Sequence, residues 1–373
     1  MSFYEQVREY KWNELEKAIQ AASETDVERA LAKDRLQPYD LIPLLSPAAS
    51  SYLEEMAQRA LGLTQQRFGR VIQLFAPLYL SNVCTNRCAY CGFNSTNPVK
   101  RLTLTTEQAE EEGRYLHQQG FRHLLLVSGE APEVVSLPYL EAILENLTPL
   151  FSSISIELYP MDSKAYEQLI SSGVDGLVVF QETYDQRRYM EVHLGGRKRD
   201  YLWRLETPER GGVAGFRNLG IGALLGLSNW RVEGFFLGLH ARYLMKNFWR
   251  SRVNISFPRI RPAASDYQLP SPVSDLHMVQ LLTALRLFLP DAGLVLSTRE
   301  PPSLRDNLIP LGITSMSAGA RTAPGGYTQG AEAEAQFDIS DHRAPGVVAE
   351  VIKQRGYEPV WKDWDRAFVE AAK

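Results

Sequence analysis

The three cysteines of the chain, Cys84, Cys88 and Cys91, lie close together with the spacing C-x3-C-x2-C. Three thiolates on one loop can hold three irons of a cubane iron–sulfur cluster and leave the fourth iron without a protein ligand. An iron with an open position can bind a small molecule and do chemistry on it, whereas a cluster with four cysteines mostly carries electrons. The spacing therefore predicts a catalytic iron–sulfur site.

A structural zinc site is one alternative for this loop. Zinc needs four ligands, usually from two Cys-x-x-Cys pairs, and the chain has a single group of cysteines. The nearest histidines, His117 and His123, fall on the next predicted helix and strand. A cluster used for electron transfer alone would need a fourth cysteine. We therefore expect neither of these sites.

The composition is that of an ordinary globular protein, with 45% hydrophobic and 23% charged residues. The net charge of -4 argues against a nucleic-acid surface, which usually shows a basic excess. The N-terminal residues lack the apolar segment of a secretory signal, and no apolar run approaches the roughly 18 residues of a membrane span. Clustered cysteines in a chain without an export signal indicate a metal site and not a disulfide framework. Without a signal or a membrane span, we expect a soluble cytoplasmic protein.

Two regions are predicted along the chain: an N-terminal helical extension over residues 1–68, and an α/β region over 69–373 with a C-terminal cap. The second region contains short apolar runs, each followed by a helical stretch, as in parallel strands buried on both faces. Eight such units in series predict a TIM-type (β/α)8 barrel, whereas an open doubly wound sheet gives no reason for eight. The predicted strands are Val71–Leu80, Arg122–Val127, Ser153–Leu158, Gly176–Phe180, Leu219–Leu225, Val253–Phe257, Gly293–Ser297 and Ile313–Ser317.

Active sites of such barrels form at the carboxyl ends of the strands. The cysteine loop follows the first strand directly, and polar groups follow most of the others. Residues 320–345 have little predicted regular structure and come after the eighth strand, so we expect them to cover the mouth. The polar groups at strand ends are Ser128-Gly129-Glu130, Glu157, Gln181-Glu182-Thr183, Arg259, Arg261, Thr298-Arg299-Glu300 and Ser317.

The cysteine spacing after a barrel strand, with Tyr90 just before the third cysteine, resembles the radical S-adenosylmethionine enzymes. In that family the cofactor's methionyl group chelates the open iron, and an electron from the cluster cleaves the cofactor to a 5′-deoxyadenosyl radical. The resemblance implies that Ser128-Gly129-Glu130 receives the methionyl ammonium, although the family has Gly where this chain has Ser128. A charge at a helix N-terminus is the alternative role for Glu130. The implied cofactor-binding residues are Tyr90, Ser128, Gly129, Glu130, Glu157 and Arg204.

Two of these residues have their own chemical reasons. Glu157, at the end of the third strand, could accept the ribose hydroxyls. Arg204 could pair with the methionyl carboxylate, because a guanidinium group matches a carboxylate with two parallel hydrogen bonds. An exposed salt bridge is the alternative for Arg204.

Further motifs resemble one branch of this family, the 2-iminoacetate synthases, which are the tyrosine lyases of thiamine biosynthesis. The resemblance implies cleavage of the Cα–Cβ bond of L-tyrosine to 2-iminoacetate (dehydroglycine) and p-cresol, with 5′-deoxyadenosine and methionine as further products. The iminoacetate would supply the thiazole moiety of thiamine. The matching motifs are Leu78–Cys84, Leu125–Glu130, Gln181–Tyr184, Arg204–Pro208, Leu296–Glu300, Pro324–Tyr327 and Val360–Asp365.

An amino-acid substrate needs a cation for its carboxylate, and Arg299 at the end of the seventh strand is suitably placed. Ser317, one strand further, could give a second hydrogen bond, and Tyr79 could contact the amine or the ring. The alternatives are a salt bridge between Arg299 and Glu300, a strand-end hydroxyl and a core aromatic. We predict Tyr79, Arg299 and Ser317 as the catalytic residues.

The resemblance also implies partners: a thiazole synthase subunit, because 2-iminoacetate hydrolyses readily, and reduced flavodoxin or ferredoxin as electron donor. The related tryptophan lyases share the barrel and the carboxylate site, so they stay open as an alternative. The related hydrogenase maturase has a second cysteine-ligated cluster. No cysteine follows Cys91 here, so we do not expect this chain to be a maturase of that kind. A non-catalytic metal-binding scaffold for thiazole synthase is the alternative of another class, and the polar mouth argues against it.

Overall fold

Eight parallel strands form a closed barrel in the computed structural model, which describes residues 2–265, 267–330 and 333–365. Each strand pairs with the next along the chain, and β1 pairs with both β2 and β8, which closes the ring. The TIM-type (β/α)8 barrel predicted from the sequence is confirmed. The strands are β1 (Val71–Ser81), β2 (His123–Ser128), β3 (Ser153–Glu157), β4 (Gly176–Glu182), β5 (Asn218–Ala223), β6 (Arg252–Ser256), β7 (Gly293–Leu296) and β8 (Ser315–Ser317).

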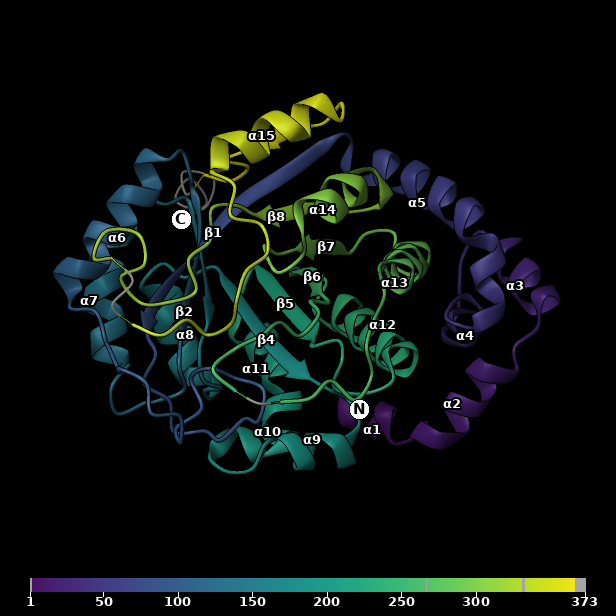
Figure 1. Ribbon diagram of the computed structural model, residues 1–373, viewed down its shortest axis with the longest axis horizontal. Coiled ribbons are helices and arrows are strands. Elements are labelled where there is room, and N and C mark those ends of the chain that lie inside the picture. The colour runs from purple at the N-terminus through teal and green to yellow at the C-terminus, as the bar shows by residue number, and fades with distance from the viewer. Residues whose placement is uncertain (1, 266, 331–332, 366–373) are drawn as a thin grey trace.

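Helices follow each strand and cover the outside of the barrel (Figure 1). Local caps start several of them: Thr105 and Gln108 form a capping box before α6, which satisfies free N–H groups of the first turn. The sequence pattern does not predict α10 and α11, where Gly211 and Gly212 lower the helix propensity. The helices are α6 (Thr106–Gln118), α7 (Leu137–Leu147), α8 (Ser163–Ser171), α9 (Gln186–Val192), α10 (Tyr201–Leu205), α11 (Thr207–Ala214), α12 (Trp230–Asn247), α13 (Asp275–Phe288), α14 (Pro302–Leu308) and α15 (Pro345–Gln354).

The helices that precede β1 lie against α12 and α13 (Figure 1). Phe3 is fully buried, and its ring stacks on His240 of α12 with centroids 4.0 Å apart. Buried Gln280 of α13 donates from Nε2 to the carbonyls of Leu44 and Ser46. The N-terminal helices therefore share one core with the barrel. They are α1 (Phe3–Val7), α2 (Trp12–Ala21), α3 (Glu24–Leu31), α4 (Leu41–Leu44) and α5 (Leu53–Phe68).

A short strand, β9 (Glu358–Val360), pairs with the first residues of β1 at the end opposite the mouth. Residues 361–365 follow β9, and the Asp363 carboxylate lies 3.0 Å from His123 Nε2 at the start of β2. Trp361 packs edge-on against Phe121. The guanidinium of Arg217 lies 4.0 Å from the ring centroid of Trp364.

Small and polar residues share the inside of the barrel with apolar ones. Ser155, Gly220, Ser256 and Ser317 line a cavity that runs inward from the mouth, at positions that bulky branched residues fill in most barrels of this type. Phe180 and Val295 line the same cavity. The barrel interior is therefore hollow enough to receive ligands.

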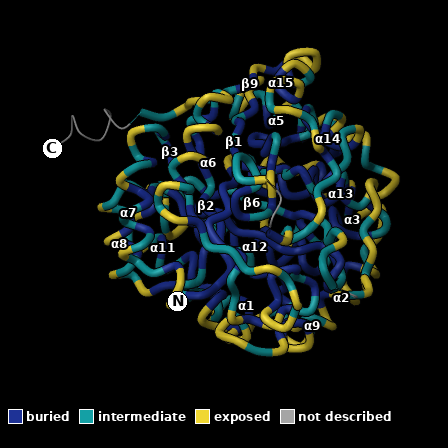
Figure 2. Tube along the Cα trace, turned by 60° about the vertical axis from the view of Figure 1, so that its left-hand side comes forward, coloured by how far each residue is buried: buried dark blue, intermediate teal, exposed yellow. Residues whose placement is uncertain are grey.

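Buried residues concentrate on the strands, and exposed ones on the outer helix faces and loops (Figure 2). Among the described residues, no helix combines the length and apolar character that crossing a membrane requires.

Candidate active site

The cysteine loop leaves β1 at the mouth of the barrel and carries three free cysteines. Three separate segments hold it through backbone hydrogen bonds. Thr85 N donates to the Glu130 carbonyl at 3.0 Å, Ala89 N to the Val192 carbonyl at 2.9 Å, and Gly92 N to the Gln336 carbonyl at 3.0 Å. The loop is therefore fixed by the ends of β2 and α9 and by the segment after β8.

Gly129 lies where the end of β2 meets this loop. A Cβ atom at this position would lie 2.2 Å from the carbonyl oxygen of Val83, so only glycine fits. The position of Ser128 tolerates a side chain, and its Oγ donates to the Gly129 carbonyl at 2.8 Å. This explains why the close approach is preserved although Ser128 departs from the family pattern.

The donor set of the loop fits an iron–sulfur cluster better than a single metal ion. Among the described residues, no three His, Cys, Asp or Glu side chains converge as ligands of one ion would. A cubane instead places each thiolate on its own iron. Burial raises the pKa of all three thiols, that of Cys91 to about 11, so a metal must supply the charge that keeps them ionised.

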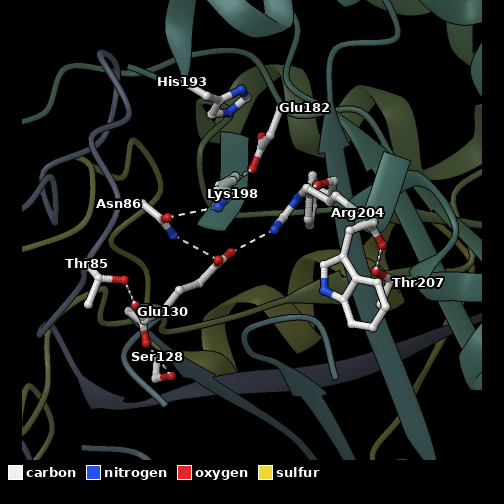
Figure 3. A network of polar contacts seen from close by, with 12 residues as sticks. Thr85, Asn86, Ser128, Glu130, Glu182, His193, Lys198, Arg204 and Thr207 are labelled. Atoms are coloured by element: carbon white, nitrogen blue, oxygen red, sulfur yellow. Dashed lines mark hydrogen bonds and ion pairs between the residues drawn. The ribbon is translucent and has the colours of Figure 1, made fainter. Parts of the chain in front are cut away.

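The predicted cofactor residues Glu130 and Arg204 lie together beside the loop (Figure 3). Arg204 Nη1 donates to Glu130 Oε1 at 2.7 Å, and Asn86 Nδ2 donates to Glu130 Oε2 at 2.8 Å. Burial alone would raise the pKa of Glu130, but Arg204 and Lys198 lower it below its usual value. The site thus holds an ionised carboxylate and a guanidinium side by side, and the exposed salt bridge considered for Arg204 is wrong, since Arg204 is buried.

A second ion pair in this network was not predicted. Lys198 Nζ, from the short turn Arg197–Arg199, lies 2.7 Å from Glu182 Oε1 at the end of β4 (Figure 3). Glu182 has φ of 69°, the one positive φ among the described residues other than glycine, and such strain concentrates at functional sites. In the sequence, Lys198 stands between two arginines and looks like part of an exposed basic run.

Tyr90, which was predicted to bind the cofactor, lies just before the third cysteine of the loop. Its hydroxyl lies 2.9 Å from His193 Nε2, and its ring packs beside Cys88 and Leu224. Burial and the nearby Lys198 lower the pKa of His193 to about 2, so the imidazole is neutral. The ring of Tyr90 therefore forms an apolar wall of the loop.

The predicted substrate residues Tyr79, Arg299 and Ser317 line one cavity, together with Glu157, which was predicted to bind the cofactor. Arg299 has its guanidinium carbon 3.3 Å from the ring centroid of Phe337, and no carboxylate of the described residues lies within 4.0 Å of it. The alternative of a salt bridge with Glu300 is wrong, because Glu300 pairs with Arg259 and Arg261. Burial lowers the pKa of Arg299, which still carries its charge at neutral pH.

The other groups in this cavity have defined hydrogen-bonding roles. Tyr79 donates its hydroxyl proton to Gln336 Oε1 at 2.7 Å. Ser317 Oγ accepts from Thr298 N at 3.1 Å, which leaves its own proton for a ligand. Burial, with the nearby Glu182, raises the pKa of Glu157 to about 7.

Gln336 and Phe337, which contact Tyr79 and Arg299, come from the segment after β8 and were missed in the sequence. The earlier part of this segment is anchored to the barrel: Tyr327 donates its hydroxyl to the Pro77 carbonyl at 2.7 Å. Its backbone N–H donates to the buried carboxylate of Glu112 on α6 at 3.1 Å. The segment contributes to the cavity wall, but no motif around Gln336 signals this.

Two family models match the chain: the radical SAM superfamily over residues 78–236, and the biotin and thiamin synthesis associated domain over residues 256–358. The chain is 44% identical to a 2-iminoacetate synthase of Escherichia coli over 98% of this chain and 97% of that protein. It is 43% identical to the same enzyme of Salmonella typhimurium, with the same coverage.

Solved structures agree with this fold. The [FeFe]-hydrogenase maturase HydG of Carboxydothermus hydrogenoformans matches with a TM-score of 0.84 and 34% identity, over 97% of this chain and 83% of that one. A further structure of HydG has a TM-score of 0.88 at 30% identity, over 99% and 84%. Methylornithine synthase shares the fold with a TM-score of 0.72 and 21% identity, over 93% of this chain and 100% of that one.

Proposed function

Because the chain belongs to the 2-iminoacetate synthases, radical S-adenosylmethionine enzymes of thiamine biosynthesis, we propose that its barrel mouth cleaves L-tyrosine to 2-iminoacetate and p-cresol. Cys84, Cys88 and Cys91 would hold a [4Fe-4S] cluster and leave its fourth iron to S-adenosylmethionine. When bound, this cluster supplies the electron that cleaves the cofactor. We place the reaction in the cytoplasm, where the cysteines stay reduced.

The residues beside the loop are suited to bind the methionyl and ribose groups. Glu130, ionised by its neighbours, would accept the ammonium, and Arg204 would receive the carboxylate. Their own 2.7 Å contact keeps both side chains in place before the cofactor binds, which lowers the entropic cost of binding. Glu157 would accept the ribose hydroxyls from inside the cavity. Gly129 allows the backbone to approach the loop closely.

The cavity is suited to an amino acid. Arg299 would bind the substrate carboxylate, with a second hydrogen bond from Ser317, whose proton is free. Because Gln336 accepts the proton of Tyr79, the phenol oxygen can accept a hydrogen bond from the substrate amine. The observation that carries this proposal is Arg299. Its enclosed guanidinium has no carboxylate partner in the described part of the chain, which is costly unless a ligand supplies one.

Reconstitution with iron and sulfide under argon tests the proposal. The reduced protein should change its EPR spectrum on addition of S-adenosylmethionine, and should form p-cresol and 5′-deoxyadenosine from L-tyrosine. A 3-methylindole-type product from tryptophan, without p-cresol from tyrosine, would move the protein to the tryptophan lyases. An EPR spectrum that ignores S-adenosylmethionine would favour the non-catalytic scaffold. The thiazole synthase subunit, as acceptor of 2-iminoacetate, should suppress release of its hydrolysis product.

A further inference from the structure

Exposed arginines lie in and beside the cysteine loop, and no carboxylate of the described residues pairs with them. Arg87 belongs to the loop, and Arg197 and Arg199 follow α9. Among the described residues, no carboxylate lies within 4.0 Å of these three guanidinium groups. Arg87 Nη2 and Arg199 Nη1 both lie 3.3 Å from the carbonyl oxygen of Leu194. Two like charges thus converge on one carbonyl, an arrangement that an external anion would stabilise.

Two further arginines stand on α9, in a segment that also carries Asp185, Glu191 and Asp200. Arg187 and Arg188 of α9 share a single acidic partner, Glu191. We call the five exposed or half-exposed arginines the basic surface, while the chain as a whole has a net charge of -4. A local positive field on an acidic protein steers an acidic partner to this face and repels the others. The basic surface consists of Arg87, Arg187, Arg188, Arg197 and Arg199.

Two apolar side chains lie among these charges. Met190 is 40% exposed and Leu194 is 49% exposed. A small apolar centre with a charged rim is the usual build of a protein–protein contact, and brief redox encounters use contacts at the small end of the size range. The basic surface therefore has the composition of a docking site for another protein.

The basic surface is also directly connected to the cysteine loop. Leu194 N donates to the Arg87 carbonyl at 2.8 Å, and Ala89 N donates to the Val192 carbonyl at 2.9 Å. Both residues that flank Cys88 are thus hydrogen-bonded to the chain that carries Met190 and Leu194. An electron delivered at this surface has a short path through bonds to the Cys88 sulfur.

We infer that the basic surface docks an acidic one-electron carrier protein and that electrons enter the cluster beside Cys88. The inference rests on the proposed function, because it needs a cluster that must be reduced. The step is balanced: the reduced flavin or iron–sulfur group of the carrier loses one electron, the cluster gains that electron, and no atom is transferred.

The test compares two reductants on charge-reversal variants of the intact, reconstituted protein. The double variant Arg187→Glu with Arg199→Glu changes the basic surface. The matched control, Arg70→Glu with Arg355→Glu, makes the same charge change at exposed positions near β9. Each protein is assayed with the hydroquinone of a purified flavodoxin, which is an acidic protein, and with sodium dithionite, which needs no docking surface.

With flavodoxin, we expect the basic-surface variant to reduce its cluster at least about 10-fold more slowly than the native protein, because electrostatic steering changes association rates by 10 to 1,000-fold. With dithionite, its rate should stay within about two-fold, and the control should match the native protein with both reductants. Added salt should slow the native reaction with flavodoxin more than that of the variant.

An unchanged rate with flavodoxin would overturn the inference, and so would equal losses with both reductants, because docking affects the protein donor alone. Cluster reduction is followed directly by EPR and absorbance, without any need for tyrosine cleavage. If dithionite reduces the cluster but tyrosine yields no p-cresol, the proposed function fails while the docking inference is still decided by the flavodoxin rates.

Discussion

At the mouth of the barrel, two neighbouring arginines differ in how their charge is balanced. Arg305 of α14 is fully buried, pairs with the buried carboxylate of Asp341, and donates to the Ser317 carbonyl. Arg299, just before α14, lines the cavity and meets the ring of Phe337 in place of a carboxylate. In the wall around Arg305 the charge is matched by a carboxylate, whereas in the hollow around Arg299 no carboxylate of the described residues matches it. The difference separates a charge that holds the fold from one that waits for a ligand.

The largest effect should come from breaking the pair in the wall. Asp341→Ala leaves Arg305 buried without its carboxylate, and removal of one partner of a buried pair costs about 3–5 kcal/mol. Urea unfolding should show this loss in the free energy of unfolding. A variant that keeps native stability would show that Asp306, which pairs with Arg343 at 2.8 Å, supplies the negative charge in place of Asp341.

In the hollow around Arg299 we expect a loss of activity without a loss of stability. Arg299→Leu should lower kcat/KM for tyrosine on the order of 100-fold, because the substrate carboxylate loses its cation. The melting temperature should stay unchanged or rise, since an enclosed cation without a partner is removed. Absorbance of the cluster and its EPR response to S-adenosylmethionine serve as controls. A fall in melting temperature like that of Asp341→Ala would erase the distinction between the two arginines.

Glu157 extends the comparison to a carboxylate of the hollow. Burial, with Glu182, raises its pKa to about 7, above the value of about 4.3 in an unfolded chain. The folded state therefore favours the protonated form of Glu157. The contribution of this group to the free energy of unfolding is fully present below about pH 4, and it is lost as the pH rises through about 7. Glu157→Gln should stabilise the protein by up to about 4 kcal/mol at pH 8 and hardly at pH 4.5, as thermal unfolding at both pH values can check.

The smallest effect on activity is expected from the hydrogen bond between Tyr79 and Gln336 at the edge of the cavity. Gln336→Leu removes the acceptor of the Tyr79 proton, worth about 1 kcal/mol, and should raise KM for tyrosine by roughly five-fold. The ratio of 5′-deoxyadenosine to p-cresol should also rise, because a misplaced substrate amine lets cofactor cleavage proceed without cleavage of tyrosine. The effects of Gln336→Leu and Tyr79→Phe should not add in the double variant. Additive effects would show that the hydrogen bond has no role in positioning.

The barrel and the cysteine loop could be predicted because their information is local. Runs such as Leu124–Val127 indicate a buried strand by themselves, and the cysteine loop carries its three ligands in one short segment, Cys84–Cys91. Glu130 and Arg299 could be found for a similar reason, since each stands at the end of a strand.

The partners of these groups could not be predicted, because they are set by the fold over long separations. Lys198 meets Glu182 after a helix and a turn, and its neighbours Arg197 and Arg199 give it the look of a solvated run. Gln336 reaches Tyr79 across 257 residues from a segment without periodicity. No local pattern shows that Arg204 is buried against Glu130, since α10 is a single turn without a strong apolar face.

The hollow interior of the barrel has a consequence for the protein's energetics. Where most barrels of this type bury branched side chains, this one has Ser155, Gly220 and Ser256, and so forgoes part of the hydrophobic stabilisation of its own centre. Bound cofactor and substrate would then serve as missing core. Any ligand that binds the folded state alone raises the free energy of unfolding by mass action, by about 2.7 kcal/mol at a hundred times its Kd. The melting temperature rises with it. Thermal shift could therefore rank candidate amino acids without any turnover.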